Sequence, residues 1–288
     1  MYAVAGVTGH TGKIVADTLI AAGVKVRVIV RNAEKGESFA ARGAEVAVAD
    51  LADAEALSRA LEGVDGAYLL IPPNAPAPDF RAYQTEVAKA IGAAVMAARV
   101  PHVVFLSSVG AEHTSGTGPI AGLNPAEAAL RAAEATGTVS TIVRAGYFVE
   151  NVAGSLGALA HGIYPTFFPA DLPIDMITTR DIGRVAASLL LEGAKTSSVV
   201  ELGGPGVTAN DIADAIGTIT GTRPQVVVNP VAAMASTLIG YGVPASIAGL
   251  YQEMTEAIID GRIHFHGVGR QVRRETPVVD VLRGLLAG

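Results

Sequence analysis

Short apolar runs alternate with longer segments in which apolar residues recur every three or four positions through the first half of the 288-residue chain. The short runs are typical of parallel strands buried on both faces, and the periodic segments are typical of helices that cover a sheet. The predicted strands are 2–5, 25–30, 45–49, 66–71, 102–107 and 139–143. The predicted helices are 14–22, 33–42, 54–61, 79–99 and 125–135. This alternation predicts an α/β protein with a doubly wound parallel sheet.

The second half of the chain is less regular. Its first part predicts, in order, helix 148–160, loop 165–169, helix 180–191 and a seventh strand, 198–202. Its last part predicts helices near 209–220, 231–239, 245–259 and 278–286. We therefore expect a Rossmann domain over 1–152 that also receives about 179–203. A smaller, mostly helical lobe on the substrate side is expected over 204–288, with contributions from about 153–178.

Composition narrows the classes of partner. The formal net charge is −6, and the cluster Arg270, Arg273 and Arg274 is the single basic run, which we interpret as solvated surface. Neither nucleic acid nor an anionic membrane is therefore an expected partner. The chain contains no cysteine, which excludes disulfides, thiolate catalysis and cysteine-ligated metal. The apolar runs are too short to span a membrane, and a strand beginning at Tyr2 leaves no room for a signal segment. We therefore expect a cytoplasmic protein. We also expect a monomer or a homodimer.

Three glycines, Gly6, Gly9 and Gly12, recur at every third position between the first predicted strand and the first predicted helix. Glycine allows backbone amides and the positive end of a helix to approach a pyrophosphate closely. The spacing is G-x-x-G-x-x-G rather than the more usual G-x-G-x-x-G. The cluster therefore predicts a dinucleotide-binding turn, with a purely structural turn as the alternative.

The residues that follow the second and third strands suggest which dinucleotide binds. Arg31, followed by Asn32 and Lys35, stands where an acidic residue would bind a ribose 2′-hydroxyl. A guanidinium there favours a 2′-phosphate, and hence NADP(H) over NAD(H), although a plain surface arginine is the alternative. Asp50 and Leu51 are placed to contact the adenine, while helix capping is a second interpretation of Asp50.

Three later strand ends carry candidate residues for the ribose, the nicotinamide and the substrate. Ile71 and Pro72 would form a rim beside the ribose, or only terminate a strand. Ser107 would face the nicotinamide end, where its hydroxyl could hold a substrate oxygen or the carboxamide; a plain turn is the alternative. Tyr147 and Phe148 would wall a planar substrate against the cofactor, with core packing as the alternative.

The six histidines carry no recognisable metal motif. His10 lies in the glycine turn, and His264 and His266 alternate without a carboxylate at a ligand-like spacing. The remaining histidines, His102, His113 and His161, are scattered singly. We therefore expect no metal site, and no flavin as a second cofactor.

Seven segments together resemble the NmrA-like branch of the atypical short-chain dehydrogenases/reductases, and within it the bacterial NAD(P)H-quinone oxidoreductase-like members. They are GVTGHTG (6–12), VIVRN (28–32), VADL (48–51), FLSSVGA (105–111), VRAGYFVEN (143–151), TTRDIGRVAA (178–187) and ELGGP (201–205). The resemblance implies that the pyrophosphate is held by Gly6, Thr8, Gly9, His10, Thr11 and Gly12. It also implies 2′-phosphate binding by Arg31, adenine binding by Asp50 and Leu51, and a border of nicotinamide and substrate formed by Tyr147, Phe148 and Asn151.

One segment departs from the superfamily pattern. Classical members carry a Tyr-x-x-x-Lys pair on the helix before the sixth strand, whereas this chain reads NPAEAALRAAEATG, in which only Glu127, Arg131 and Glu134 are charged. A ketone substrate needs a proton donor, but a quinone-like acceptor can take a hydride and then protons from water. We therefore expect an NADPH-dependent oxidoreductase that reduces quinone-like or other conjugated planar acceptors by direct hydride transfer, with catalytic residues unassigned. The alternative is a non-catalytic NADP(H)-sensing regulator that binds a protein partner.

Overall fold

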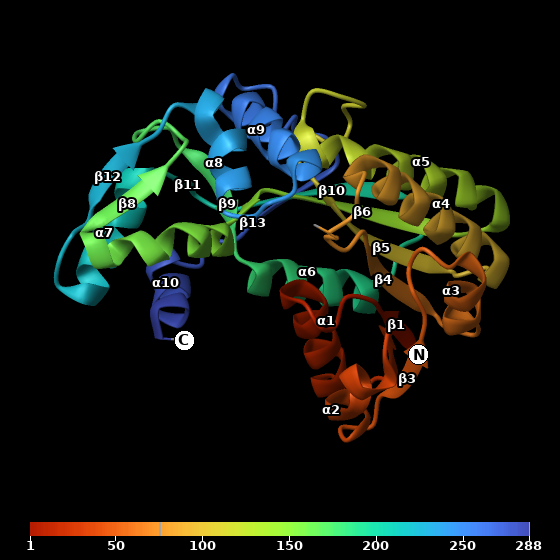
Figure 1. Cartoon of the computed structure of the whole chain (residues 1–288). Coiled ribbons are helices and arrows are strands. Elements are labelled where there is room, and N and C mark those ends of the chain that lie inside the picture. The colour runs from red at the N-terminus through yellow and green to blue at the C-terminus, as the bar shows by residue number, and fades with distance from the viewer. Residues whose placement is uncertain (75, 288) are drawn as a thin grey trace.

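The computed structural model describes residues 1–74 and 76–287 and contains a parallel sheet of eight strands (Figure 1). The strand order is β13-β10-β6-β5-β4-β1-β2-β3. The strands are β1 (Tyr2–Val4), β2 (Val26–Val30), β3 (Glu45–Val48), β4 (Gly66–Leu70), β5 (His102–Ser108), β6 (Val139–Ala145), β10 (Ser198–Gly203) and β13 (Arg270–Arg273). The first six strands follow the order 3-2-1-4-5-6, which confirms the predicted doubly wound fold.

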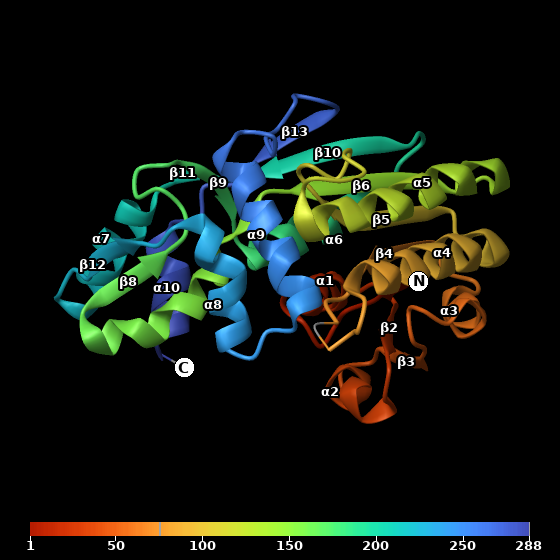
Figure 2. The same ribbon diagram turned by 45° about the horizontal axis from the view of Figure 1, so that its top comes forward.

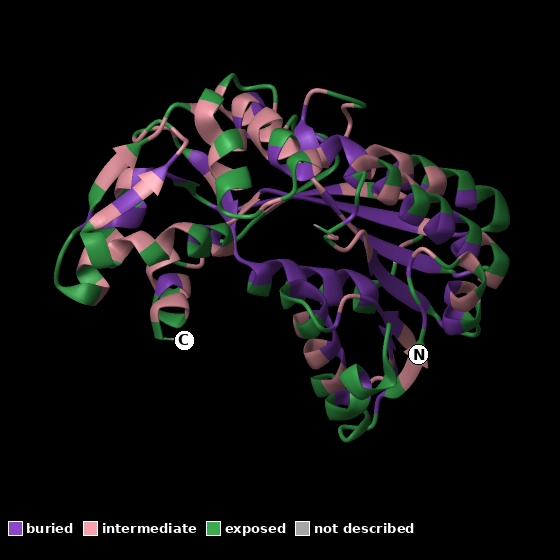
Figure 3. Cartoon of the chain, viewed as in Figure 1, coloured by how far each residue is buried: buried purple, intermediate pink, exposed green. Residues whose placement is uncertain are grey.

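Helices cover both faces of this sheet (Figure 2). One face is covered by α1 (His10–Ala21), α6 (Thr179–Glu192) and the short α2 (Glu37–Ala40), which follows the 3₁₀ turn η1 (Ala33–Gly36). The other is covered by α3 (Ala54–Leu61), α4 (Phe80–Ala98) and α5 (Asn124–Ala132), flanked by η2 (Gly118–Leu123) and η3 (Ala133–Thr136). The sheet between the two layers is buried, whereas the outer sides of the helices are exposed (Figure 3). Each face of the sheet thus packs against its helices through its own apolar core. These two cores hold in place the edge of the sheet at which the strands end.

The smaller lobe is built on two small sheets and helices. The sheets are β11-β9-β7 and β12-β8, formed by β7 (Tyr147–Phe148), β8 (Ile163–Thr166), β9 (Ile174–Ile177), β11 (Gly206–Val207) and β12 (Gln225–Val228). The helices are η4 (Val149–His161), α7 (Ala209–Thr220), η5 (Val231–Ala233), α8 (Met234–Gly240), α9 (Ala245–Ile259) and α10 (Val278–Ala287). A third apolar core joins these elements around Tyr164, Ile212 and Leu282.

Two local predictions need correction. Segment 148–160 is helical, as predicted, but Phe148 ends β7 and the helix that follows it is a 3₁₀ helix. Gly154 and Gly157 lie in this segment, and glycine disfavours the α-helix. The predicted loop 165–169 begins inside β8.

Arg270, Arg273 and Arg274 are exposed, as the interpretation of solvated surface predicted, but no strand was predicted at these positions. Arg270 and Arg273 form the ends of β13, an edge strand paired in parallel with β10. The stretch between the predicted helices 245–259 and 278–286 thus returns to the main sheet. Residue 288 lies outside the described residues. The division of the chain into two domains stays a prediction.

No helix in the described part of the chain is both long and apolar enough to cross a membrane.

Candidate cofactor and substrate site

The glycine turn lies between β1 and α1, at the carboxyl edge of the sheet. Gly6 has φ +67°, a conformation that favours glycine, and its carbonyl accepts a hydrogen bond from the Gly9 amide at 2.9 Å. Gly12 packs against the end of β1: a Cβ there would lie 2.4 Å from the Ala5 carbonyl oxygen and 2.5 Å from the Gly6 carbonyl. The third glycine therefore permits the close contact between α1 and β1, as in dinucleotide-binding folds.

The amino end of α1 is suited to an anion. Thr8, Gly9 and His10 are exposed, the cap residue Gly9 makes no side-chain cap, and the first turn holds no acidic residue. Amide groups at such an end have no partner within the helix, and the helix dipole favours negative charge there. Thr11 is buried, and its Oγ1 accepts a hydrogen bond from the Tyr68 hydroxyl on β4 at 2.9 Å. The turn is thus held to β4 through Thr11, while Thr8 and His10 stay exposed beside the amino end of α1.

The 2′-phosphate candidates follow β2. Arg31 and Lys35 are exposed, whereas the Asn32 Oδ1 already accepts a hydrogen bond from the Glu34 amide at 3.1 Å and caps η1. Their roles toward a cofactor stay predictions.

Tyr83 on α4 joins these residues, and sequence reasoning missed it. Burial raises the pKa of Tyr83, the Asp50 carboxylate adds to this rise, and the Arg31 guanidinium opposes it. Arg31 and Asp50 therefore each lie within electrostatic reach of Tyr83. A single tyrosine in an alanine-rich helix offered no signal of this.

At the third strand, the capping interpretation of Asp50 is wrong. The Asp50 Oδ1 accepts a hydrogen bond from the Ala52 amide at 2.9 Å, but Asp53 is the residue that caps α3. Leu51 is buried in the core, so it presents little surface to a ligand. Ile71 and Pro72 are half-buried directly after β4, in the position expected of a rim.

Ser107 lies in a buried ionic network rather than in an open turn. Its Oγ donates a 2.6 Å hydrogen bond to the Glu127 Oε1 on α5, so this proton is not free for a ligand. Glu127 is 1% exposed and also pairs with Arg144 on β6, whose Nη2 lies 2.8 Å from its Oε2 and whose Nε lies 3.1 Å from its Oε1. Glu127, on the helix that lacks the Tyr-x-x-x-Lys pair, therefore links β5 to β6 through Ser107 and Arg144.

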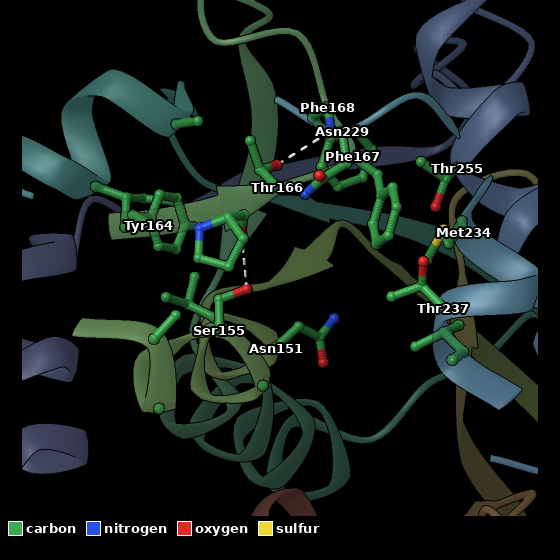
Figure 4. Close-up of a pocket in the computed structure, with 18 of the residues that line it drawn as sticks. Asn151, Ser155, Tyr164, Thr166, Phe167, Phe168, Asn229, Met234, Thr237 and Thr255 are labelled. Carbon is green, nitrogen blue, oxygen red and sulfur yellow. Dashed lines mark hydrogen bonds between the residues drawn. The ribbon is translucent and has the colours of Figure 1, made fainter. Parts of the chain in front are cut away.

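The smaller lobe contains a pocket of about 730 Å³ (Figure 4). Tyr147 and Asn151, two predicted substrate-site residues, line it just beyond the carboxyl end of β6. The Tyr147 ring meets the Phe168 ring edge-on, with centroids 5.6 Å apart. Burial raises the pKa of Tyr147 to about 12, against a hydrogen bond with Asn151 that lowers it. The Tyr147 hydroxyl is therefore protonated at neutral pH and can donate a hydrogen bond.

Phe148 is not among the residues that line this pocket. Neighbouring residues of a strand point to opposite faces, and Phe148 packs against the core under α1 and α6. The structure therefore separates the two aromatic residues that the sequence placed together, and a place for Phe148 beside the nicotinamide stays a prediction.

The described lining of the pocket contains no Asp, Glu, Lys or Arg. Aromatic and aliphatic side chains dominate it, with amide and hydroxyl groups and one imidazole, that of His161, between them. Figure 4 labels Asn151, Ser155, Tyr164, Thr166, Phe167, Phe168, Asn229, Met234, Thr237 and Thr255. Most of these were not predicted; the adjacent Phe167 and Phe168 between prolines were the one visible sign of an aromatic wall.

A doubly wound parallel sheet with a glycine turn at the amino end of its first helix defines a dinucleotide-binding protein of the Rossmann class. The NmrA-like family matches residues 2–265, so the chain belongs to the NmrA-like family, as its motifs predicted.

Several reductases resemble this chain over most of its length. The NAD(P)H azoreductase of Xenophilus azovorans is 27% identical over 259 residues, which cover 88% of this chain and 86% of that protein. Quinone oxidoreductase 2 of Escherichia coli is 29% identical over 209 residues, covering 71% and 68%. The crystal structure of the E. coli NADPH-dependent quinone oxidoreductase with NADPH superposes with a TM-score of 0.82 at 24% identity, covering 99% of this chain and 100% of that one. The Citrobacter triphenylmethane reductase with NADP(H) gives 0.77 at 20% identity, covering 99% and 100%, and like the previous structure it supports the fold.

Proposed function

We propose that this protein is an NADPH-dependent oxidoreductase that reduces uncharged, conjugated planar acceptors of the quinone type by direct hydride transfer. The observation that carries the proposal is an aromatic pocket whose described lining contains no Asp, Glu, Lys or Arg, at the same sheet edge as the glycine turn. The quinone oxidoreductase and azoreductase relatives support the general class of NAD(P)H-dependent reductase.

The residues fit the cofactor at both of its charged groups. The exposed amides at the amino end of α1 would hold the pyrophosphate, and Arg31 with Lys35 would hold the 2′-phosphate. When bound, NADPH supplies the hydride. This chain supplies binding and orientation, since hydride chemistry belongs to the cofactor.

Tyr147 is the residue best placed to orient an acceptor. Its protonated hydroxyl can donate a hydrogen bond to a carbonyl oxygen, and the Phe168 ring, which stands nearly perpendicular to that of Tyr147, lines the same pocket. Hydride addition to a quinone leaves a delocalised oxyanion, which takes its proton from water. A dedicated proton donor on α5 is then unnecessary. Glu127 can instead have a structural role, as the partner of Arg144.

The missing Tyr-x-x-x-Lys pair favours a second candidate, an NADP(H)-sensing regulator that binds the cofactor without turning it over. Such a protein would bind NADPH normally and show no oxidation of it with any acceptor.

Charge in the pocket tests the substrate class. Wild type should have a higher kcat/KM for a neutral naphthoquinone than for its sulfonated analogue or a cationic triphenylmethane dye. Asn229→Asp adds a negative charge to the pocket at constant size, and it should lower kcat/KM for the sulfonated acceptor about tenfold or more, because juxtaposed like charges cost several kcal/mol. Gln225→Glu places the same charge on the exposed β12 and is the control. If kcat/KM were equal for all three acceptors and unchanged by Asn229→Asp, the reaction would not take place in this pocket.

Arg31→Ala tests the cofactor preference. Affinity for NADPH should fall about tenfold to a hundredfold, because hydrogen bonds to charged groups contribute about 1.5–3 kcal/mol, while affinity for NADH stays nearly constant. Calorimetric titration with both cofactors measures the difference. Arg59→Ala, which removes an exposed arginine on α3, is the matched control. Equal losses for the two cofactors would show that Arg31 does not bind the phosphate.

A further inference from the structure

Two loops distant in sequence bring together a carboxylate and two imidazoles. Glu112 and His113 lie on the loop that follows β5, and His266 lies between α9 and β13. The three donor atoms all lie within 4.8 Å of one another. The sequence predicted no metal site because no carboxylate stands near His266 in the chain; the fold supplies one from 154 residues away.

The distances within this cluster suit a tetrahedral cation. The Glu112 Oε1 lies 2.9 Å from the His266 Nε2 and 3.8 Å from the His113 Nε2. Tetrahedral zinc with ligands at about 2.0–2.1 Å places its donor atoms roughly 3.3–3.4 Å apart. The two Glu112 separations lie about half an ångström on either side of this value, and the two imidazole nitrogens lie within 4.8 Å of one another.

The surroundings of the cluster orient its donors. The His113 Nε2 is buried and has no hydrogen-bond partner among the described residues, an arrangement that is costly unless a ligand is bound. The second oxygen of Glu112 lies 2.9 Å from the Arg144 Nη1, which leaves Oε1 toward the histidines. The His264 ring lies 4.1 Å from the His266 ring and limits its rotation. Partners of this kind fix ligand orientation in metal sites.

We propose that Glu112, His113 and His266 bind a divalent transition-metal ion of the Zn²⁺ type, with water in the fourth position. Two imidazoles and one carboxylate are a donor set that suits zinc. The ion would join the loop after β5 to the loop before β13, where the Arg262 Nη1 already donates a 2.6 Å hydrogen bond to the Gly116 carbonyl. None of the three ligands lines the substrate pocket.

Titration with Zn²⁺ against a chromophoric chelator tests the proposal on chelator-treated full-length protein. Because the chain has no cysteine, histidine and carboxylate sites account for the binding. Wild type should bind one Zn²⁺ per chain, and His113→Ala and His266→Ala should each weaken binding at least about tenfold, since even outer-shell changes cost 10–100-fold. His10→Ala, which removes an exposed histidine elsewhere, should leave the affinity unchanged.

Two further measurements guard against misfolded variants. Zn²⁺ should raise the Tm of wild type and leave that of His113→Gln, which retains a side chain of similar length, nearly unchanged. Bound Co²⁺ should show the visible absorption of a four-coordinate ion in wild type alone. Absence of saturable one-to-one binding to wild type, or unaltered affinity in both folded histidine variants, would overturn the proposal.

Discussion

Gly12→Ala is expected to remove NADPH binding and to destabilise the fold together. The added Cβ would lie 2.4–2.5 Å from three backbone atoms of Ala5 and Gly6, and backbone cannot rotate away as a side chain can. Overpacking of a core typically costs 1–3 kcal/mol, and we expect about 3 kcal/mol here because the contacts are rigid. The turn must open to relieve them, which displaces the amides that would hold the pyrophosphate.

Gly9→Ala is the matched variant that separates binding from folding. A Cβ at Gly9 would have the Gly6 carbonyl oxygen as its nearest contact, at 3.4 Å, and the backbone angles there are accessible to alanine. Stability should therefore stay within about 0.5 kcal/mol of wild type, while NADPH affinity falls because the methyl group stands beside the exposed amides. Urea unfolding by circular dichroism and calorimetric titration with NADPH measure the two effects. Wild-type affinity in both variants would show that the cofactor does not bind at this turn.

Glu127→Gln should lower the free energy of unfolding by about 3 kcal/mol. Loss of one partner from a buried ion pair typically costs 3–5 kcal/mol, because the remaining charge stays buried and uncompensated. Arg144 would be that charge, since it is 8% exposed. In the variant, Arg144 still has an ion pair with Glu112 at 2.9 Å. The expected loss of stability is therefore at the lower end of the range of about 3–5 kcal/mol.

Glu134→Gln is the control for this effect, because Glu134 is an exposed carboxylate just after α5. It should change stability by less than about 0.5 kcal/mol. The double variant Glu127→Leu/Arg144→Met removes both charges of the pair and should recover part of the loss. Denaturant unfolding of the four proteins checks the series. A Glu127→Gln protein as stable as wild type would contradict a structural role for this pair.

The central strands β1, β4 and β5 could be predicted from sequence because they are largely buried on both faces and therefore read as continuous apolar runs. The strand β13 could not. Its sequence, RQVR, has three exposed positions, and it becomes a strand because β10 offers an unpaired edge. The short strand β8 was missed for a related reason, since it pairs only with β12 about sixty residues further along the chain.

The candidate site also has features that could be predicted from local sequence and features that could not. The glycine turn and Tyr147 are local features that directly follow strands, so their positions at the carboxyl edge could be anticipated. The roles of Ser107 and Phe148 depend on which neighbour each side chain meets, and the structure directs both away from the pocket. The aromatic pocket and the contact between Glu112 and His266 join distant segments, which no local pattern encodes.

The central claim is that this chain binds NADPH and transfers its hydride directly to a conjugated acceptor. Anaerobic stopped-flow measurement of the reduced-nicotinamide absorbance, with NADPH and with NADPH deuterated at C4, tests it most directly. We predict that a neutral naphthoquinone oxidises bound NADPH and that deuterium at the transferred position slows the reaction. Calorimetric binding of NADPH without oxidation by any quinone or dye would contradict the claim and favour the sensor.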